Sequence, residues 1–447
     1  MHMQRSAIRE VLEDQAAQSS PVPGGGRVLE REALAPWRRF ASAGVAKVTT
    51  GVRRSGKTVF TRQLLGDRRF ASVDFDDERL AAAGREDLDV ILGALHEIHG
   101  AFEYLFLDEV QNVPAWELFV NRLQRSGMKV FVSGSSAHML SRELATHLTG
   151  RFIQIEVFPF SFREYAAWQG LEARPTTAGK AALRRALASY LAGGGFPEVV
   201  AEPAMGNIYL SSLYTSIITR DILARYRIRH AKTFREMAAS IVSNLARPLT
   251  YNKLKNTFGL GSVHTARNYV DYLSEAYLVF VLDKYSPKPK EILNSPKKAY
   301  VIDTGLMNAL SLSPAKDRGA QLENAVFLEL LRRRALDRTT ELFFWKDYQD
   351  REIDFVVRRG NTVTALVQVT HASGRDEVDN RERRSLLAGA ESLRCKNLMI
   401  VTWDYEGDDK SGERRIVHIP AWKWLLMTPD GNPTGAAGRE PVKPPAR

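Results

Sequence analysis

The segment Gly51–Thr58 constrains this chain more than any other, because it reads Gly-Val-Arg-Arg-Ser-Gly-Lys-Thr and fits the pattern G-x-x-x-x-G-K-[ST]. A strand candidate over 45–50 precedes it and a helix candidate over 57–65 follows it. Glycines let backbone N–H groups face phosphate oxygens, and the helix adds its positive N-terminal end. Lys57 is expected to reach the β- and γ-phosphates, and Thr58 to place its hydroxyl on Mg²⁺. The predicted nucleotide-binding residues are Gly51, Val52, Arg53, Arg54, Ser55, Gly56, Lys57 and Thr58.

A second half of the site is predicted where an apolar strand ends in acid. The run 104–107 is apolar and is followed directly by Asp108 and Glu109. We expect Asp108 to hold Mg²⁺ through water and Glu109 to polarise the attacking water. Alone, this pattern fits a solvated strand end, and the phosphate loop upstream is what favours catalysis. The next strand candidate, 129–133, is followed by serines, where Ser135 is a candidate γ-phosphate sensor and a serine-rich turn is the alternative.

Short β-rich runs alternate with helical runs through the first third of the chain. The strand candidates are 45–50, 70–75, 104–107, 129–133 and 152–157. Strands separated by helices favour βαβ units and a parallel sheet. The length of 447 residues is enough for about three domains in all.

The middle of the chain is strongly basic. Residues 201–300 hold 15 Lys and Arg against 7 Asp and Glu, which is +8 of the total +11. Helix candidates at 235–245, 250–258 and 262–274 precede two strand candidates, an order typical of a winged helix. We expect DNA to be the partner, although winged helices also serve as protein-docking modules. The predicted DNA contacts are Arg267 on the third helix and four lysines in the connection between the two strand candidates, which we call the basic hairpin: Lys288, Lys290, Lys297 and Lys298.

The last folded segment resembles the restriction-endonuclease-like fold. Glu323 lies on a helix candidate and Asp354 on a strand candidate, as the acids of that fold do. The fold's E-x-K position, however, reads Gln368-Val369-Thr370, so one carboxylate and the lysine are absent. Both groups are needed to bind metal and activate water. We therefore expect this domain to be non-catalytic, and the sequence offers no clear displaced lysine.

The phosphate loop, the Asp108-Glu109 pair and Ser135 together resemble the AAA+ ATPases. The likeness is strongest to a prokaryotic group whose C-terminal half is a domain of unknown function, and it spans about 38–406. The shared segments are 51–58, 107–114, 133–137, 148–151, 158–162 and 194–198. This resemblance implies Mg²⁺-dependent ATP hydrolysis and a homo-oligomer in which an arginine completes the neighbouring site. Arg151 is the first candidate for that arginine, and Arg220 is the second.

The expected fold class is α/β: a P-loop NTPase parallel sheet, then a helical winged-helix domain and an α+β restriction-endonuclease-like domain. The expected boundaries are 1–36 for an N-terminal helix and linker, 37–165 for the AAA+ core, 166–205 for a small helical lid, 206–305 for the winged helix, 306–427 for the nuclease-like domain and 428–447 for a disordered tail.

The composition narrows the setting. A single cysteine, Cys395, excludes an internal disulfide and a multi-cysteine zinc site. No apolar run reaches the roughly 18 residues that a membrane span needs, and the polar first residues do not suggest a secretory signal. We expect a cytoplasmic ATPase that is coupled to DNA binding or remodelling. The alternatives are an ATP-gated switch or scaffold that acts on a protein, and an ATP-regulated nuclease.

Overall fold

The computed structural model describes residues 3–18, 27–135, 150–310 and 317–428. Its N-terminal part is a five-stranded parallel sheet in the order β2-β3-β4-β1-β5. The strands are β1 (Ala46–Thr50), β2 (Phe70–Asp74), β3 (Tyr104–Asp108), β4 (Lys129–Gly134) and β5 (Phe152–Glu156). All five predicted strands are therefore confirmed. This parallel α/β sheet matches a P-loop NTPase fold.

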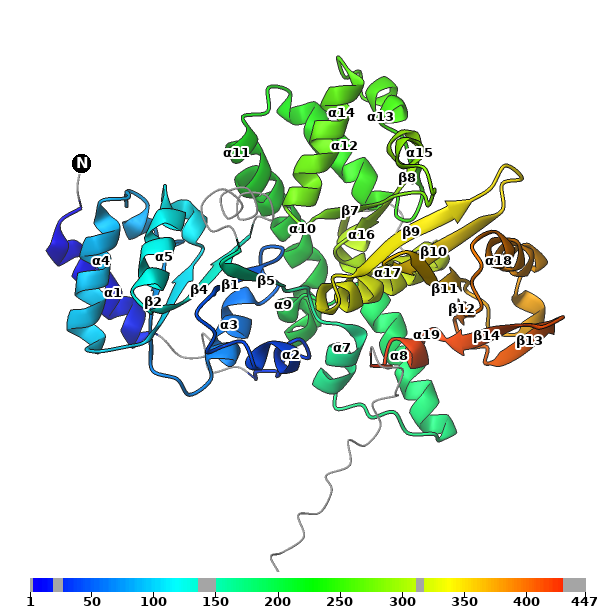
Figure 1. Cartoon of the computed structure of the whole chain (residues 1–447), viewed down its shortest axis with the longest axis horizontal. Helices are drawn as coiled ribbons and strands as arrows, with labels where there is room; N and C mark the ends of the chain where they lie inside the picture. Colours follow the sequence, from blue (N-terminus) through cyan, green and yellow to red (C-terminus); the bar gives the residue numbers. More distant parts are fainter. Residues whose placement is uncertain (1–2, 19–26, 136–149, 311–316, 429–447) are drawn as a thin grey trace, which may run out of the picture.

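Helices cover both faces of this sheet, as parallel sheets require (Figure 1). One face packs against α1 (Arg5–Ala17), α4 (Asp87–His99) and α5 (Trp116–Arg125). The other packs against α2 (Leu34–Arg38) and α3 (Lys57–Leu65). Because all strands run the same way, the carboxyl ends of β1, β3 and β4 lie at one edge of the sheet. The predicted phosphate loop and acid pair follow these ends.

A helical region follows the sheet. Its helices are α7 (Phe162–Trp168), α8 (Thr177–Gly193), α9 (Pro197–Ala201), α10 (Gly206–Ser216), the π-helix η4 (Ile217–Leu223), α11 (Ala224–Tyr226), α12 (Ala231–Ser243), α13 (Tyr251–Thr257) and α14 (Val263–Glu275). Next to α12–α14 lies a small antiparallel sheet, β6-β8-β7, made of β6 (Pro248–Leu249), β7 (Val279–Leu282) and β8 (Lys297–Val301).

The basic hairpin differs from expectation. Helix α15 (Pro289–Asn294) fills the connection between β7 and β8. Lys297 and Lys298 begin strand β8, and their exposed fractions are only 6% and 2%. The prediction that these two lysines contact DNA is wrong, because a buried ammonium already engaged by carboxylates cannot reach a phosphate.

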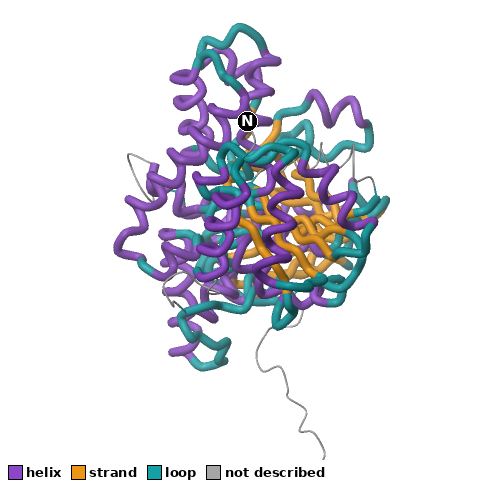
Figure 2. The backbone as a smooth tube through the Cα atoms, turned by 90° about the vertical axis from the view of Figure 1, so that its left-hand side faces the viewer, coloured by secondary structure: helices purple, strands orange, loops and turns teal. Residues whose placement is uncertain are grey.

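The C-terminal region contains a six-stranded sheet in the order β13-β14-β12-β11-β10-β9. Its elements are α16 (Thr304–Leu310), α17 (Arg318–Leu336), β9 (Thr340–Lys346), β10 (Glu352–Arg359), β11 (Thr362–Val369), α18 (Asn380–Ser392), β12 (Leu398–Thr402), β13 (Gly407–Ser411), β14 (Arg414–Pro420) and α19 (Ala421–Trp424). One hydrophobic cluster joins this region to the helical one, through Phe234, Leu273, Phe327 and Phe355 among others. Figure 2 shows the strands gathered in the interior with helices around them. No helix among the described residues is long and apolar enough to cross a membrane.

Asp303 fixes the contact between these two regions. Its carboxylate accepts hydrogen bonds from the backbone N–H groups of Gly195, at 2.6 Å, and Gly305, at 2.9 Å. A Cβ at Gly194 would lie 1.9 Å from Asp303 Oδ1, so only glycine fits at that position. Burial raises the pKa of Asp303 to about 7, although these backbone donors act in the opposite direction.

We predict that Asp303 makes stability depend on pH. Its ordinary pKa is 3.8 and its folded pKa is about 7, so between these values the folded protein holds a proton that the unfolded chain has released. Its contribution is complete below the unfolded pKa and is lost as the pH rises through about 7. Asp303→Asn should therefore gain stability relative to wild type as the pH rises from 4 to 8, by at most roughly 4 kcal/mol. Denaturant unfolding at a series of pH values measures the difference, and a pH-independent difference would contradict the assignment.

Candidate nucleotide site

The phosphate loop runs from Thr50, at the end of β1, to Lys57, at the start of α3. Gly51 and Gly56 adopt φ values of +152° and +89°, in the region that favours glycine. A Cβ at Gly51 would also lie 2.1 Å from the Val157 carbonyl oxygen. The backbone conformation therefore favours glycine at both positions, and at Gly51 there is also no room for a side chain.

The loop and the acid strand are joined through Asp108. Thr58 Oγ1 donates a hydrogen bond of 2.7 Å to Asp108 Oδ2, and the Ser133 hydroxyl donates to Asp108 Oδ1. Burial raises the pKa of Asp108, while these two donors favour its ionised form. A hydroxyl and a carboxylate side by side supply the hard oxygen ligands that Mg²⁺ prefers. The residues predicted to hold Mg²⁺, Thr58 and Asp108, therefore lie together and fit that ion.

Glu109 faces the loop lysine. Lys57 Nζ lies 3.5 Å from Glu109 Oε1 and donates to the Val52 carbonyl at 3.3 Å. Gln111 Nε2 donates to Glu109 Oε2 at 2.5 Å. Burial acts to raise the pKa of Glu109, but Lys57 and Gln111 outweigh it and the pKa lies below its ordinary value. Glu109 is therefore ionised at neutral pH, as a general base must be.

Two serines of the site present unsatisfied hydroxyls. The Oγ atoms of Ser55 and Ser135 are buried and have no hydrogen-bond partner among the described residues. Buried polar groups are normally satisfied, so phosphate oxygens or water fit these positions. Ser133 was not predicted, yet it donates to Asp108 and accepts the Glu109 backbone N–H at 3.2 Å. Ser133 could have been identified only from the order of the strands, because β4 lies between β1 and β3 and so brings its end next to Asp108.

Residues far from the loop in sequence hold it from outside. Arg53 Nε and Nη2 each lie 3.4 Å from an oxygen of Asp221, on the π-helix η4. Arg54 Nη1 lies 3.7 Å from Glu198 Oε1, so the shared segment 194–198 lies next to the phosphate loop. None of these partners was predicted, since each depends on tertiary packing.

Arg31 supports the back of the loop. It is 7% exposed, and it donates to the carbonyls of Ser55, at 3.0 Å, and Phe158, at 2.7 Å. Its Nε also donates to Glu164 Oε1 at 2.7 Å. A buried arginine with two carbonyl acceptors and a carboxylate partner fixes the loop against α7 and the segment before it.

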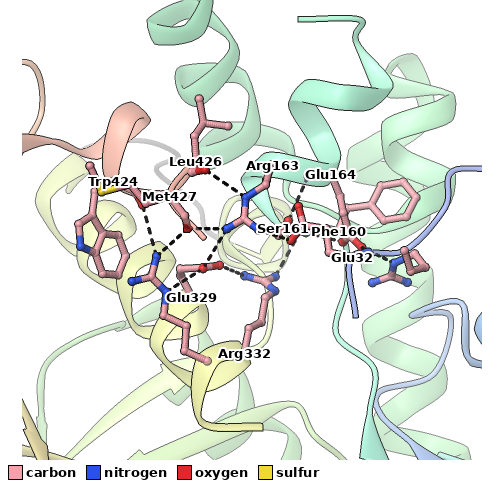
Figure 3. A network of polar contacts seen from close by, with 12 residues as sticks. Glu32, Phe160, Ser161, Arg163, Glu164, Glu329, Arg332, Trp424, Leu426 and Met427 are labelled. Atoms are coloured by element: carbon pink, nitrogen blue, oxygen red, sulfur yellow. Dashed lines mark hydrogen bonds and ion pairs between the residues drawn. The ribbon is translucent and has the colours of Figure 1, made fainter. Parts of the chain in front are cut away.

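Figure 3 shows this network continuing into the C-terminal region. Arg163 binds Glu32 at 2.9 Å, lies 3.5 Å from Glu329 on α17, and donates to the Met427 carbonyl at 2.7 Å. The residues just before α2, the helix α7, the helix α17 and the end of the described chain therefore meet behind the nucleotide site.

The two candidate arginines lie in different places. Arg151 directly precedes β5, and its carbonyl accepts from Ala46 N–H at the start of β1, so it lies at the sheet edge opposite the loop. Its guanidinium donates to Asn121 Oδ1 at 3.1 Å. Arg220 is exposed beside Asp221 and therefore lies close to Arg53 of the same chain.

The remaining predicted DNA contacts are on the surface. Arg267 is exposed on α14, with its Nε 3.9 Å from Asp271 Oδ2. Lys288 and Lys290 are exposed at the start of α15, and Lys288 Nζ lies 3.1 Å from Glu291 Oε1. Weak, exposed ion pairs of this kind leave the cations free to exchange partners.

The predicted nuclease-like acids surround a lysine. Lys298 Nζ lies 3.0 Å from Glu323 Oε1, 2.8 Å from Glu352 Oε1 and 3.0 Å from Asp354 Oδ1. This lysine comes from β8, and neither it nor Glu352 was predicted to lie with Glu323 and Asp354. Its ammonium occupies the centre of the acids, and no group of three or more metal-ligating side chains with suitable geometry occurs among the described residues. The acids present do not fit a bound metal ion in this arrangement.

Family models match most of this chain. The family described as "AAA domain" matches residues 44–166, and two domains of unknown function, DUF8612 and DUF4143, match 184–317 and 318–422. A Haemophilus influenzae uncharacterized protein is 28% identical over 340 residues, covering 73% of this chain and 82% of that protein. Among solved structures, the Walker-type ATPase PABY2304 of Pyrococcus abyssi covers 63% of this chain and 96% of its own, with a TM-score of 0.40 and 13% identity.

A fuller match comes from Methanocaldococcus jannaschii. Its uncharacterized protein MJ1544 is 35% identical over 399 residues, which cover 85% of this chain and 88% of that protein. The chain therefore belongs to the same family as MJ1544, and its own domain matches make it an AAA-type ATPase with C-terminal domains of unknown function.

Proposed function

We propose that this protein hydrolyses ATP with Mg²⁺ and couples hydrolysis to a partner bound by its C-terminal regions. The hydrogen bond of 2.7 Å between Thr58 and Asp108 carries the proposal, because it joins the loop and acid halves of the site. Lys57 binds the β- and γ-phosphates, and Thr58 and Asp108 hold Mg²⁺. The metal neutralises charge on the phosphates when bound.

In this proposal Glu109 activates the attacking water. Its ionised carboxylate orients the attacking water and accepts its proton, while Ser135 senses the γ-phosphate. An arginine from a neighbouring subunit stabilises the transferred phosphoryl group, as in other phosphoryl-transfer sites. Arg151 serves this role between subunits of a homo-oligomer, because it lies at the opposite sheet edge from its own loop; Arg220 is the second candidate.

The proposed partner is DNA. Helices α12–α14 and the sheet β6-β8-β7 serve as a winged helix, with Arg267 on the reading helix and Lys288 and Lys290 beside it. Support comes from the +8 charge of residues 201–300. Nuclease activity is not proposed, because Lys298 fills the acid cluster in the region 306–427.

A protein partner is the second candidate function, as in an ATP-gated switch. One observation favours it: a groove of about 720 Å³ lies beside α14. Its lining includes the apolar residues Phe280, Phe327 and Leu331 together with charged residues of both signs. Apolar side chains and acids in a groove suit a peptide better than a phosphate backbone, which is polar and negatively charged.

Substitution of Glu109 tests the chemistry. Glu109→Gln keeps the shape of the site but removes the base, so ATP binding should persist while turnover falls by roughly 10²–10⁴-fold. Lys57→Ala should instead weaken nucleotide binding itself. Phosphate release and equilibrium binding of ATP measure the two effects separately. Wild-type turnover in Glu109→Gln would show that another residue activates the water.

Salt dependence tests the DNA partner. Replacing Arg267, Lys288 and Lys290 by alanine should make the slope of log K against log salt shallower by up to roughly two to three units on duplex DNA, because each phosphate contact contributes about 0.9. If Arg267 reads a base edge, its loss alone should cost about 1–3 kcal/mol on a preferred sequence and much less on others.

A matched control removes three exposed cations elsewhere, Arg394, Lys396 and Lys410. The slope should not change in that variant. Equal slopes in wild type and both variants would reject the DNA interface and favour the protein partner.

A further inference from the structure

The end of α14 is attached directly to the strand that enters the phosphate loop. Tyr277 lies two residues after α14 ends at Glu275, and its hydroxyl donates a hydrogen bond of 2.7 Å to Thr50 Oγ1. Thr50 is the last residue of β1 and directly precedes Gly51. Gln154 Nε2, on β5, donates to the same oxygen at 3.2 Å. Tyr277 is 5% exposed and Thr50 is fully buried, so the contact is shielded from bulk water.

The backbone of Tyr277 is unusual. Its φ of +57° lies in the left-handed region, which is unfavourable for a bulky side chain. The residue is held there by its own N–H, which donates to the Ser274 carbonyl at 3.0 Å, and by burial of its ring. Such conformations persist only where the surroundings impose them, and they cluster at functional positions.

A second contact joins α14 to the loop from the other side. Tyr226, at the end of α11, stacks on Tyr272 of α14 with ring centroids 4.0 Å apart, and its hydroxyl donates to Glu275. Helix α11 continues the π-helix η4, whose Asp221 binds Arg53 within the loop. Stretches of π-helix occur frequently at functional sites.

Helix α14 therefore has one end at the loop and the other in solvent. Val263, His264 and Arg267 are exposed in its first half, while Val270 and Leu273 are buried in the core. A helix of 13 residues packed along one side is a rigid element through which a displacement at the exposed end can be transmitted to Tyr277.

We propose that Tyr277 positions the phosphate loop through Thr50, and that this contact lets α14 regulate the nucleotide site. The Asp221–Arg53 pair is the second point of attachment. This inference rests on the proposed nucleotide function and adds to it the regulation of the same site by the surface of α14. In this proposal Tyr277 acts through Thr50, as a positioning residue.

A double-mutant cycle tests the contact. Tyr277→Phe and Thr50→Val each remove one partner and preserve volume. Each should lower kcat/KM for ATP by roughly 5–10-fold, the cost of a buried hydrogen bond. The double variant should be no worse than the more affected single variant, because both remove the same interaction. Tyr269→Phe, also buried on α14, is the matched control and should stay within twofold of wild type.

A purely structural role makes a different prediction. In that case Tyr277→Phe would lower the Tm and leave kcat and KM unchanged, which would overturn the proposal. Independent effects that multiply in the double variant would overturn it as well.

Hydrogen exchange gives a readout that does not depend on hydrolysis. ATP should slow exchange in peptides that cover 262–283 of the wild type, and this change should be lost in Tyr277→Phe. Wild type that binds ATP without any change in these peptides would refute the regulation by α14. If the wild-type protein binds ATP and shows slower exchange in these peptides but does not hydrolyse ATP, the proposed hydrolysis is refuted and the regulation by α14 is not.

Discussion

The hydrogen bond between the Thr58 hydroxyl and the Asp108 carboxylate is the interaction on which the site depends. It joins the helix that follows the phosphate loop to the acid at the end of β3. The strands β1 and β3, from which these two parts extend, are not neighbours in the sheet. The strand between them, β4, places Ser133 where its hydroxyl contacts Asp108 from the other side. Parallel strands are what bring all three side chains to one edge.

The rest of the chain is arranged around that edge. Arg31 fixes the loop from behind, Asp221 holds it through Arg53, and Tyr277 holds the strand before it. Each of these residues comes from a different part of the chain. The nucleotide site is therefore contacted by the segment before α2 and by two parts of the helical region, and physical connections of this kind are what coupling between sites requires.

The sequence was informative where function depends on local pattern. The loop 51–58, the pair Asp108-Glu109 and the five strands were predictable, because glycine spacing, apolar runs and alternation with helices are local signals. Ser133 and Asp221 were not, because their roles follow from strand register and from packing of the π-helix. The two lysines at 297 and 298 were assigned to the surface because charged residues are rarely buried, and the compensating acids lie up to 56 positions away.

The calorimetric affinity of the wild-type protein for ATP, measured with Mg²⁺ and again with a chelator, tests the central claim most directly. If Thr58 and Asp108 form the metal-nucleotide site, ATP should bind at one site per chain, and Mg²⁺ should tighten binding at least roughly tenfold, about 1.4 kcal/mol. This gain should disappear in Asp108→Asn. Absence of ATP binding, or an Mg²⁺ effect that survives in Asp108→Asn, would contradict the account.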